Sequence, residues 1–173
     1  MKARTFFCII FVLVALTCPS SATAGWFSGL GDPNDPNALT VWAGAGDESN
    51  LGRLGAVLWP FELGIEYAHY TPGTNSLDQL GVYALVHDIG AWVLGVFDFS
   101  QAMAQLPEPV QPTFYGGGFL ASDLQFEGYS LGPCLGLTVG AFFAEYRWPT
   151  TAGDVSRLFD ETPKFIAGAR IEF

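Results

Sequence analysis

Strict two-residue alternation decides the fold class, and it is clearest in residues 61–70, FELGIEYAHY. One set of alternate residues is mostly apolar: Phe61, Leu63, Ile65, Tyr67 and His69. The other set carries two carboxylates: Glu62, Gly64, Glu66, Ala68 and Tyr70. Because successive side chains of a β-strand point to opposite faces, the stretch predicts a strand with one apolar and one charged face.

The same period recurs near the end of the chain, in residues 141–148 and 164–173. Further strands with a less regular pattern are predicted at 38–45, 51–58, 79–87, 91–99, 113–121 and 130–139. Turn-rich or polar residues separate most of these segments, and residues 150–163 are expected to form such a loop. Past the first 24 residues, no helical stripe and no apolar run of 18 residues is found, so an all-β fold is predicted.

The composition excludes several classes of protein. Of the 173 residues, 50% are hydrophobic and only 14% are charged, whereas soluble domains average roughly 25% charged residues. An ordinary cytosolic enzyme is therefore a poor fit, and the 15% of aromatic residues exclude intrinsic disorder. The formal charge of −10 argues against nucleic acid as a partner.

Residues 1–24 have the three parts of a secretory signal peptide. Lys2 and Arg4 form the basic region, residues 5–18 the apolar core, and Ala22-Thr23-Ala24 the cleavage site. That core would rise only about 21 Å as a helix, which is too short to cross roughly 30 Å of hydrocarbon. Lipidation of Cys18 is the alternative, but a lipobox has Gly, Ala or Ser where this chain has Thr17.

The expected organisation is thus a signal peptide (1–24), an extended N-terminal lead (25–37) and a β-barrel (38–173). Cleavage removes Cys8 and Cys18 and leaves Cys134 alone, so no intrachain disulfide is expected.

Two all-β arrangements fit the alternation. A soluble barrel would turn its apolar faces inward, whereas a membrane barrel turns them towards lipid and keeps a polar lumen. The charges on the polar faces are few and separated by small residues, which fits a narrow lumen in which opposite charges pair. The predicted lumen network is Glu62, Glu66, Glu145, Arg147, Arg170 and Glu172. Either Arg147 or Arg170 would cost about 2–4 kcal/mol at mid-depth in lipid, which favours the inward register.

The apolar faces often end in aromatic residues, which collect at membrane interfaces because the ring is buried and the polar tip stays wet. The residues predicted to lie at the interfaces are Trp59, Tyr67, Tyr146 and Trp148, with Tyr70, Phe97 and Phe99 in similar positions. The sparse charges on the polar faces and the aromatic ends of the apolar faces both favour the membrane arrangement.

Three stretches resemble small bacterial outer-membrane β-barrels. Residues 164–173, KFIAGARIEF, resemble the C-terminal strand of that class, in which alternating apolar residues and a terminal aromatic are the assembly signal. The residues matching that signal are Phe165, Ile171 and Phe173. Residues 112–118 resemble a strand opening, and 144–148 the penultimate strand, of OmpA-like membrane domains. No periplasmic domain is expected after the barrel.

The resemblance implies a closed antiparallel up-and-down barrel in the outer membrane of a Gram-negative bacterium. It also implies, as partners, outer-membrane lipid and lipopolysaccharide, and the barrel assembly machinery during insertion; a monomer is expected. Nine segments are candidates for strands, but such barrels have an even number. Eight strands are predicted, with ten as the alternative, and residues 91–99 are left over.

No catalytic chemistry is predicted. His69 is expected on the lipid side near a strand end, and His87 to be a turn residue. Metal, phosphate-loop and nucleophile-elbow motifs are absent from the sequence, so no metal or cofactor is expected. The predicted role is structural, in envelope integrity or in surface interactions through the loops. The alternatives are a narrow porin-like channel, a lipid A-modifying barrel enzyme and a soluble secreted barrel.

Overall fold

The computed structural model describes residues 38–71, 75–89, 112–153, 155–158 and 161–173. The signal peptide (1–24), the N-terminal lead (25–37) and the candidate strand 91–99 lie outside the described residues. Within the described part, no helix is long and apolar enough to cross a bilayer.

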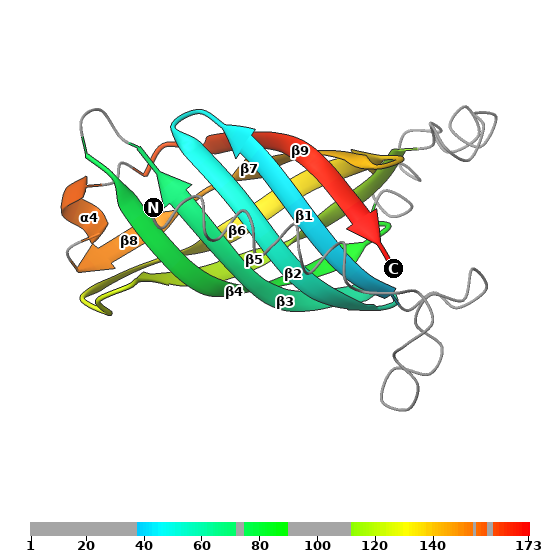
Figure 1. Ribbon diagram of the computed structural model, residues 1–173, viewed down its shortest axis with the longest axis horizontal. Helices are drawn as coiled ribbons and strands as arrows, with labels where there is room; N and C mark the ends of the chain where they lie inside the picture. Colours follow the sequence, from blue (N-terminus) through cyan, green and yellow to red (C-terminus); the bar gives the residue numbers. More distant parts are fainter. Residues whose placement is uncertain (1–37, 72–74, 90–111, 154, 159–160) are drawn as a thin grey trace, which may run out of the picture.

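The described residues form nine strands and one four-residue helix (Figure 1). The strands are β1 (Ala38–Gly46), β2 (Ser49–Leu58), β3 (Phe61–Tyr70), β4 (Leu77–His87), β5 (Pro112–Asp123), β6 (Gly128–Val139), β7 (Phe142–Arg147), β8 (Thr150–Gly153) and β9 (Lys164–Glu172). The helix is α4 (Val155–Leu158). Eight predicted segments match strands, with bounds that agree to within two residues.

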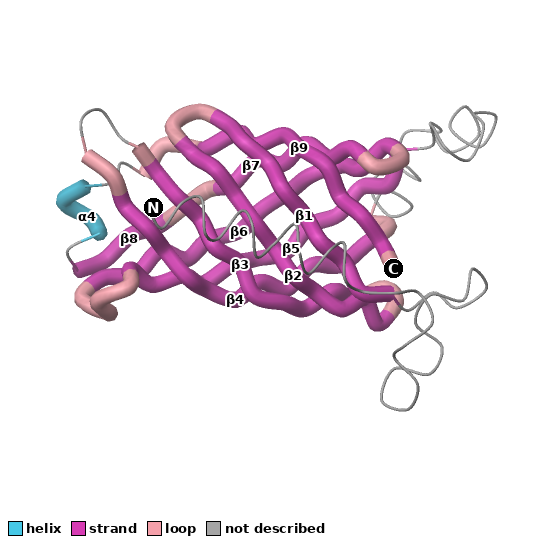
Figure 2. The backbone as a smooth tube through the Cα atoms, in the orientation of Figure 1, coloured by secondary structure: helices cyan, strands magenta, loops and turns pink. Residues whose placement is uncertain are grey.

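All strand pairs are antiparallel, and the sheet closes on itself (Figure 2). The order is β5-β4-β3-β2-β1-β9-β7-β6-β8, and a further β5–β6 pairing joins the two sides. Strands β7 and β8 are two parts of one strand, because both pair with β6 in the same register, as Cys134↔Arg147 and Gly128↔Gly153 show. The fold is therefore a closed eight-stranded barrel, as predicted.

The predicted loop 150–163 needs a correction, because its first part is β8 and residues 155–158 form α4. Strand β6 reaches back to Gly128 and offers a paired edge to Thr150–Gly153. Trp148 and Pro149 interrupt the strand between β7 and β8. Since proline has no N–H for the ladder, this interruption hid the continuation from sequence patterning.

The register of the ladders fixes the tilt of the strands. Starting at Ala38, successive paired residues run around the barrel through Val57, Glu62, Leu85, Gly117, Cys134, Arg147 and Lys164. The β1–β9 ladder pairs Gly46 with Ile166, so two residues further along it Lys164 lies opposite Glu48. Glu48 comes ten residues after Ala38, so one circuit of the barrel advances the register by ten residues. With ordinary strand spacing and rise, this stagger over eight strands corresponds to a tilt of roughly 40°.

The barrel has two distinct ends. At the terminal end, β1 begins and the chain ends, and Leu39 and Phe173 exchange backbone hydrogen bonds of 3.2 and 2.9 Å. At the opposite, loop end lie the Asp47-Glu48 turn, residues 124–127 and α4 (Figure 1).

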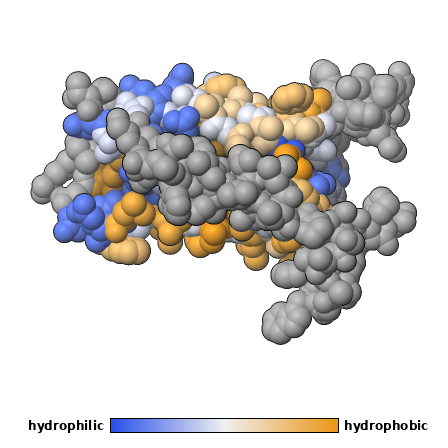
Figure 3. All heavy atoms as spheres, in the orientation of Figure 1, coloured by the Kyte–Doolittle hydropathy of each residue, from blue (hydrophilic) through white to orange (hydrophobic). Residues whose placement is uncertain are grey.

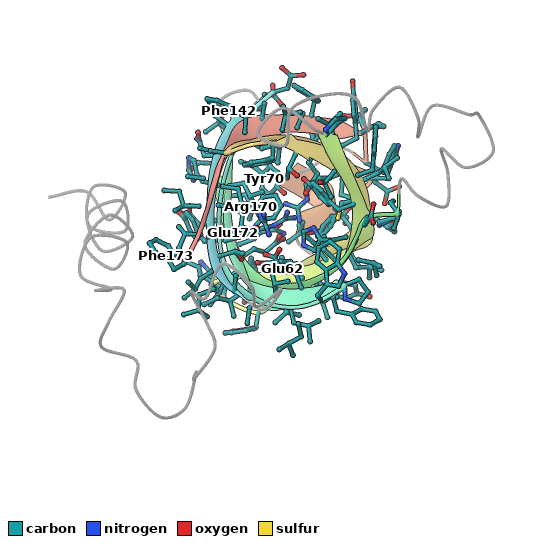
Figure 4. All side chains as sticks on the ribbon, turned by 90° about the vertical axis from the view of Figure 1, so that its right-hand side faces the viewer. Glu62, Tyr70, Phe142, Arg170, Glu172 and Phe173 are labelled. Carbon is teal, nitrogen blue, oxygen red and sulfur yellow. The ribbon has the colours of Figure 1, made fainter. Side chains whose placement is uncertain are left out.

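The polarity of the barrel is inverted. Glu62, Glu66, Glu145, Arg53 and Arg147 are all buried. The exposed large hydrophobic residues that face outward from the strands include Phe61, Leu63, Ile65, Leu80, Val82, Leu120, Leu131, Leu135, Phe142, Tyr146 and Ile171. The end-on view shows Glu62 and Arg170 inside the ring and Phe142 outside it (Figure 4), and apolar residues cover much of the wall in Figure 3.

Adjacent residues of β3 illustrate this inversion. Glu66 is 1% exposed inside the barrel, whereas Tyr67 lies on the outer face. The register predicted from the alternation is therefore confirmed.

Candidate functional site: the charged lumen

Besides a buried hydrogen bond of 2.8 Å from Ser130 to Gln79, two clusters of inward-facing polar side chains lie inside the barrel. The central cluster consists of Arg53, Glu66, Glu145 and Arg147, with Tyr70 and Tyr115 as hydroxyl partners. The terminal cluster surrounds Glu62 and consists of Thr40, Trp42, Tyr83, His87 and Arg170. Period-2 alternation places all of these residues on the inner face of their strands.

The guanidinium of Arg53 joins both carboxylates of the central cluster. Arg53 Nη1 and Nη2 donate to the two oxygens of Glu145 at 2.6 and 2.8 Å, which is a bidentate geometry. Its Nε donates to Glu66 Oε2 at 3.1 Å. The ring of Tyr83 lies 4.6 Å from the Arg53 guanidinium carbon. Arg53 is thus held by two carboxylates and one aromatic face.

Arg147 completes the central cluster from the other side of the lumen. Its Nη2 donates to Glu66 Oε1 at 2.5 Å, and its Nη1 donates to the Tyr70 hydroxyl at 3.4 Å. The guanidinium carbon lies 3.7 Å from the centroid of the Phe119 ring. Two cations and two anions, all buried, therefore compensate one another without net charge.

Glu62 is held mainly by neutral donors. Its Oε1 accepts hydrogen bonds from Thr40 Oγ1 at 2.6 Å, Tyr83 Oη at 2.7 Å and Trp42 Nε1 at 2.8 Å. Gly55 leaves room for this arrangement, because a Cβ there would lie 2.8 Å from the same oxygen. The other oxygen, Oε2, is 2.7 Å from His87 Nε2. The Glu62 carboxylate is thus saturated with donors.

Arg170 links the terminal cluster to the mouth of the barrel. Its Nη2 is 3.4 Å from Glu62 Oε2, and its Nη1 pairs with Glu172. The Glu172 side chain is 52% exposed, so this last member of the predicted network lies at the terminal end (Figure 4). The charge network therefore runs from the mouth of the barrel inward.

The structure brings five of the six predicted lumen residues into two groups. Glu66, Glu145 and Arg147 meet in the central cluster, and Glu62 and Arg170 meet in the terminal one. Sequence patterning missed Arg53, because residues 51–58 are apolar or small on both faces and gave no clear alternation. The cost of an arginine facing lipid was the signal that would have placed it inward.

The predicted positions of His87 and Tyr70 are wrong. His87 is the last residue of β4, and its ring is buried against Glu62 rather than being a turn residue. Tyr70, grouped with the interface aromatics, shares the inner face of β3 with Glu66 and accepts from Arg147. In both cases the residue is the last of its strand and still follows the strand's alternation, which places its side chain inside the barrel.

The four predicted interface residues lie on the outside of the barrel. Trp59 is exposed in the turn between β2 and β3 at the terminal end. Tyr146 and Trp148 are exposed near one another, with ring centroids 6.1 Å apart, and Phe165 packs 5.2 Å from Tyr146. Phe165 and Ile171 point outward from β9, and Phe173 pairs with Leu39. Their role as an assembly signal stays a prediction.

Among the described residues, no group of three or more His, Cys, Asp or Glu side chains is arranged to hold a metal ion. Cys134 is a free, buried thiol on the inner face of β6. Most polar atoms of the two clusters are hydrogen-bonded to one another, whereas Nε of Arg147 and Nε of Arg170 have no hydrogen-bond partner among the described residues. Neither cluster contains a serine or cysteine next to a base.

No protein-family model matches the chain, and no curated protein matches it. The chain is similar to a solved structure, the N-terminal beta-barrel domain of Pseudomonas aeruginosa OprF. The match has 14% sequence identity and a TM-score of 0.39, and it covers 79% of this chain and 95% of that domain.

Proposed function

We propose that this chain is a β-barrel protein of the bacterial outer membrane with a structural role, in envelope integrity or in presenting its loops to partners. In this proposal the signal peptide 1–24 directs export and is cleaved, and the barrel inserts as a monomer in a Gram-negative outer membrane. The observation that carries the proposal is the inverted polarity of the barrel wall.

The outer face is suited to lipid along nearly the whole of the barrel. On the outward faces of the nine described strands, the only carboxylate or basic side chains are His69 and Asp78, near the loop end. A strand of about ten residues at this tilt crosses roughly 25 Å, the height of the apolar band of such barrels. Exposure of this apolar wall to water would be unfavourable, whereas contact with the apolar lipid tails avoids that cost.

The lumen supports a structural role rather than transport or catalysis. In both clusters each carboxylate is paired with an arginine and hydrogen-bonded to neighbouring side chains, and eight strands enclose a space that side chains fill. Opening a path for ions would require breaking the paired charges of Arg53, Glu66 and Glu145. We therefore expect a closed lumen.

Expression of the full chain in a Gram-negative host tests the membrane assignment. The mature protein should fractionate with the outer membrane, require detergent for extraction, and migrate faster on SDS gels before heating than after it. Recovery of a folded, detergent-free protein from the aqueous fraction would contradict the proposal.

Two further measurements test the proposed role. Planar-bilayer recordings of the purified barrel should show no discrete conductance steps, and such steps would favour the channel alternative. Mass spectrometry of lipid A from cells with and without the protein should give the same species, and a modified species would favour the enzyme alternative.

A further inference from the structure

The apolar surface of the barrel extends beyond the strands at the tip of the β5–β6 hairpin. This tip consists of residues 124–127, Leu-Gln-Phe-Glu, between Asp123 at the end of β5 and Gly128 at the start of β6. Leu124 is 58% exposed, and Phe126 is 82% exposed, more than any other large hydrophobic residue that the structure describes. Two large apolar side chains at the loop end are therefore left largely uncovered by the described part of the chain.

The backbone of the tip holds Phe126 in a costly conformation. Its φ is 60°, in the left-handed region that glycine adopts far more readily than a bulky aromatic residue. Asp123 fixes the turn, because its Oδ1 accepts hydrogen bonds from the backbone N–H of Glu127 at 2.9 Å and of Gly128 at 3.2 Å. The backbone N–H of Phe126 donates to the Asp123 carbonyl at 3.1 Å. The exposed ring is thus presented by a backbone that hydrogen bonds hold in place.

The strand register places this tip higher than the turn between β1 and β2 at the same end. Four successive ladder pairs link Asp123 to β1, through Gln79, Ala68, Leu51 and Gly44. Since one circuit from β1 through β5 to β9 advances ten residues towards the loop end, each step along this ladder rises about 3 Å in that direction. The Asp47-Glu48 turn lies only three to four residues beyond Gly44. The tip therefore stands roughly 5–10 Å above that turn.

An apolar strip connects the tip with the lipid-facing wall. The outward residues of β6 below the tip are Tyr129 and Leu131, which are 46% and 44% exposed, and Leu120 lies beside them on β5. On β2 and β8, by contrast, the outward residues at the loop end are polar, Asn50 and Thr150. The head-group layer of a bilayer extends about 5–7 Å beyond the hydrocarbon on each side. The strip thus continues from the hydrocarbon level into the level of the head groups on this hairpin.

We propose that the β5–β6 tip is a membrane anchor, with Leu124 and Phe126 buried in the head-group layer of the leaflet at the loop end. The proposal rests on the membrane location proposed above, and it adds a lipid contact that lies beyond the barrel wall. Apolar and aromatic side chains favour this layer over water. Contact with lipid therefore offsets the cost of holding Phe126 in the left-handed conformation.

A fluorescent label on the tip tests the contact. In the mature chain, Cys134→Ser with Gln125→Cys leaves one thiol for a nitrobenzoxadiazole label, and both apolar side chains stay in place. The protein is folded in vesicles of dioleoyl phosphatidylcholine that include a phosphatidylcholine with a nitroxide on its head group as the quencher. We expect stronger quenching at Gln125 than at the same label on Glu48→Cys, which reports the lower turn. Equal or weaker quenching at Gln125 would overturn the proposal and would indicate a tip in water, as for a protein partner.

Phe126→Gly in the Gln125-labelled protein separates a lipid contact from a role in the turn. Glycine suits a φ of 60°, so the variant should keep its fold and its heat-dependent gel shift. Loss of the ring should lower the ratio of membrane-bound to free tip about tenfold, as when one large apolar side chain leaves lipid. Phe142→Ala is the matched control, because it removes a 71% exposed ring at the terminal end (Figure 4). Undiminished quenching in Phe126→Gly, or an equal loss in Phe142→Ala, would also overturn the proposal.

The heat-dependent gel shift of each sample keeps the two proposals distinguishable. A labelled protein that shows the shift, but whose tip is quenched no more than the Glu48 position, refutes the anchor and leaves the barrel assignment intact. A wild-type protein that shows no shift and needs no detergent refutes the membrane location instead.

Discussion

The two clusters in the lumen satisfy buried carboxylates in different ways. In the central cluster Glu145 is held by a bidentate arginine, and Glu66 bridges two arginines. In the terminal cluster Glu62 takes three hydrogen bonds from neutral donors at 2.6–2.8 Å, and its arginine stands further off at 3.4 Å. One cluster relies on opposite charge, and the other on hydrogen bonds.

The difference indicates how each cluster should respond to loss of a member. Removing one ion from a compensated buried group leaves an unpaired charge, which is costly because it can be neither solvated nor neutralised cheaply. Removing one of several neutral donors leaves the carboxylate with the others, so the cost should approach that of one hydrogen bond. The four predictions below test this contrast through urea unfolding of the protein in lipid vesicles, followed by tryptophan fluorescence.

Arg53→Met should have the largest effect, lowering the free energy of unfolding by about 3–5 kcal/mol. The substitution leaves Glu145 with Tyr115 and with Arg147, whose Nε is 3.4 Å away. The double variant Arg53→Met/Glu145→Gln should recover part of the loss, because it also removes one of the orphaned charges. A cost below about 1 kcal/mol would mean that the central carboxylates do not depend on charge pairing.

Glu62→Gln should cost about 2 kcal/mol. The amide oxygen can still accept some of the hydrogen bonds that Oε1 now accepts. The amide NH₂ would replace Oε2 and face Arg170 and His87, which are donors themselves, so these contacts would be lost. Glu62→Ala is the comparison variant, and it should cost more, because every donor around the carboxylate then loses its acceptor. A Glu62→Gln effect as large as that of Arg53→Met would remove the contrast between the clusters.

Arg170→Met applies the same substitution as Arg53→Met to the terminal cluster, and it should cost only about 1–2 kcal/mol. The contact with Glu62 is long, and Glu172 at the mouth is open to water. Equal losses for the two arginine variants would show that the way in which each carboxylate is satisfied does not set the cost.

Thr40→Val should have the smallest effect, about 1 kcal/mol. Valine has nearly the same shape, and Glu62 Oε1 keeps the hydrogen bonds from Tyr83 and Trp42. Thr40→Ser, which retains the hydroxyl, is the control and should unfold close to wild type. A loss of 3 kcal/mol or more from Thr40→Val would identify this hydroxyl as essential rather than redundant.

Much of the wall could be predicted residue by residue, because alternation is a local property. The bounds of β3 agree with the prediction, and the inward placement of Glu62 and Glu66 follows from the register of that strand alone. Prediction failed where the pattern was weak or broken. Small residues on both faces of β2 concealed Arg53, and the Trp148-Pro149 interruption concealed β8.

The sequence by itself determined which face of each strand is apolar and which is charged, since the two-residue period assigns sides before any strand has a neighbour. Only the tertiary structure decided which charges meet. Arg53 and Glu145 are 92 residues apart and lie on β2 and β7, which are not neighbours in the sheet. Their contact forms across the lumen, because closure of eight strands with a ten-residue stagger brings those inner faces opposite each other.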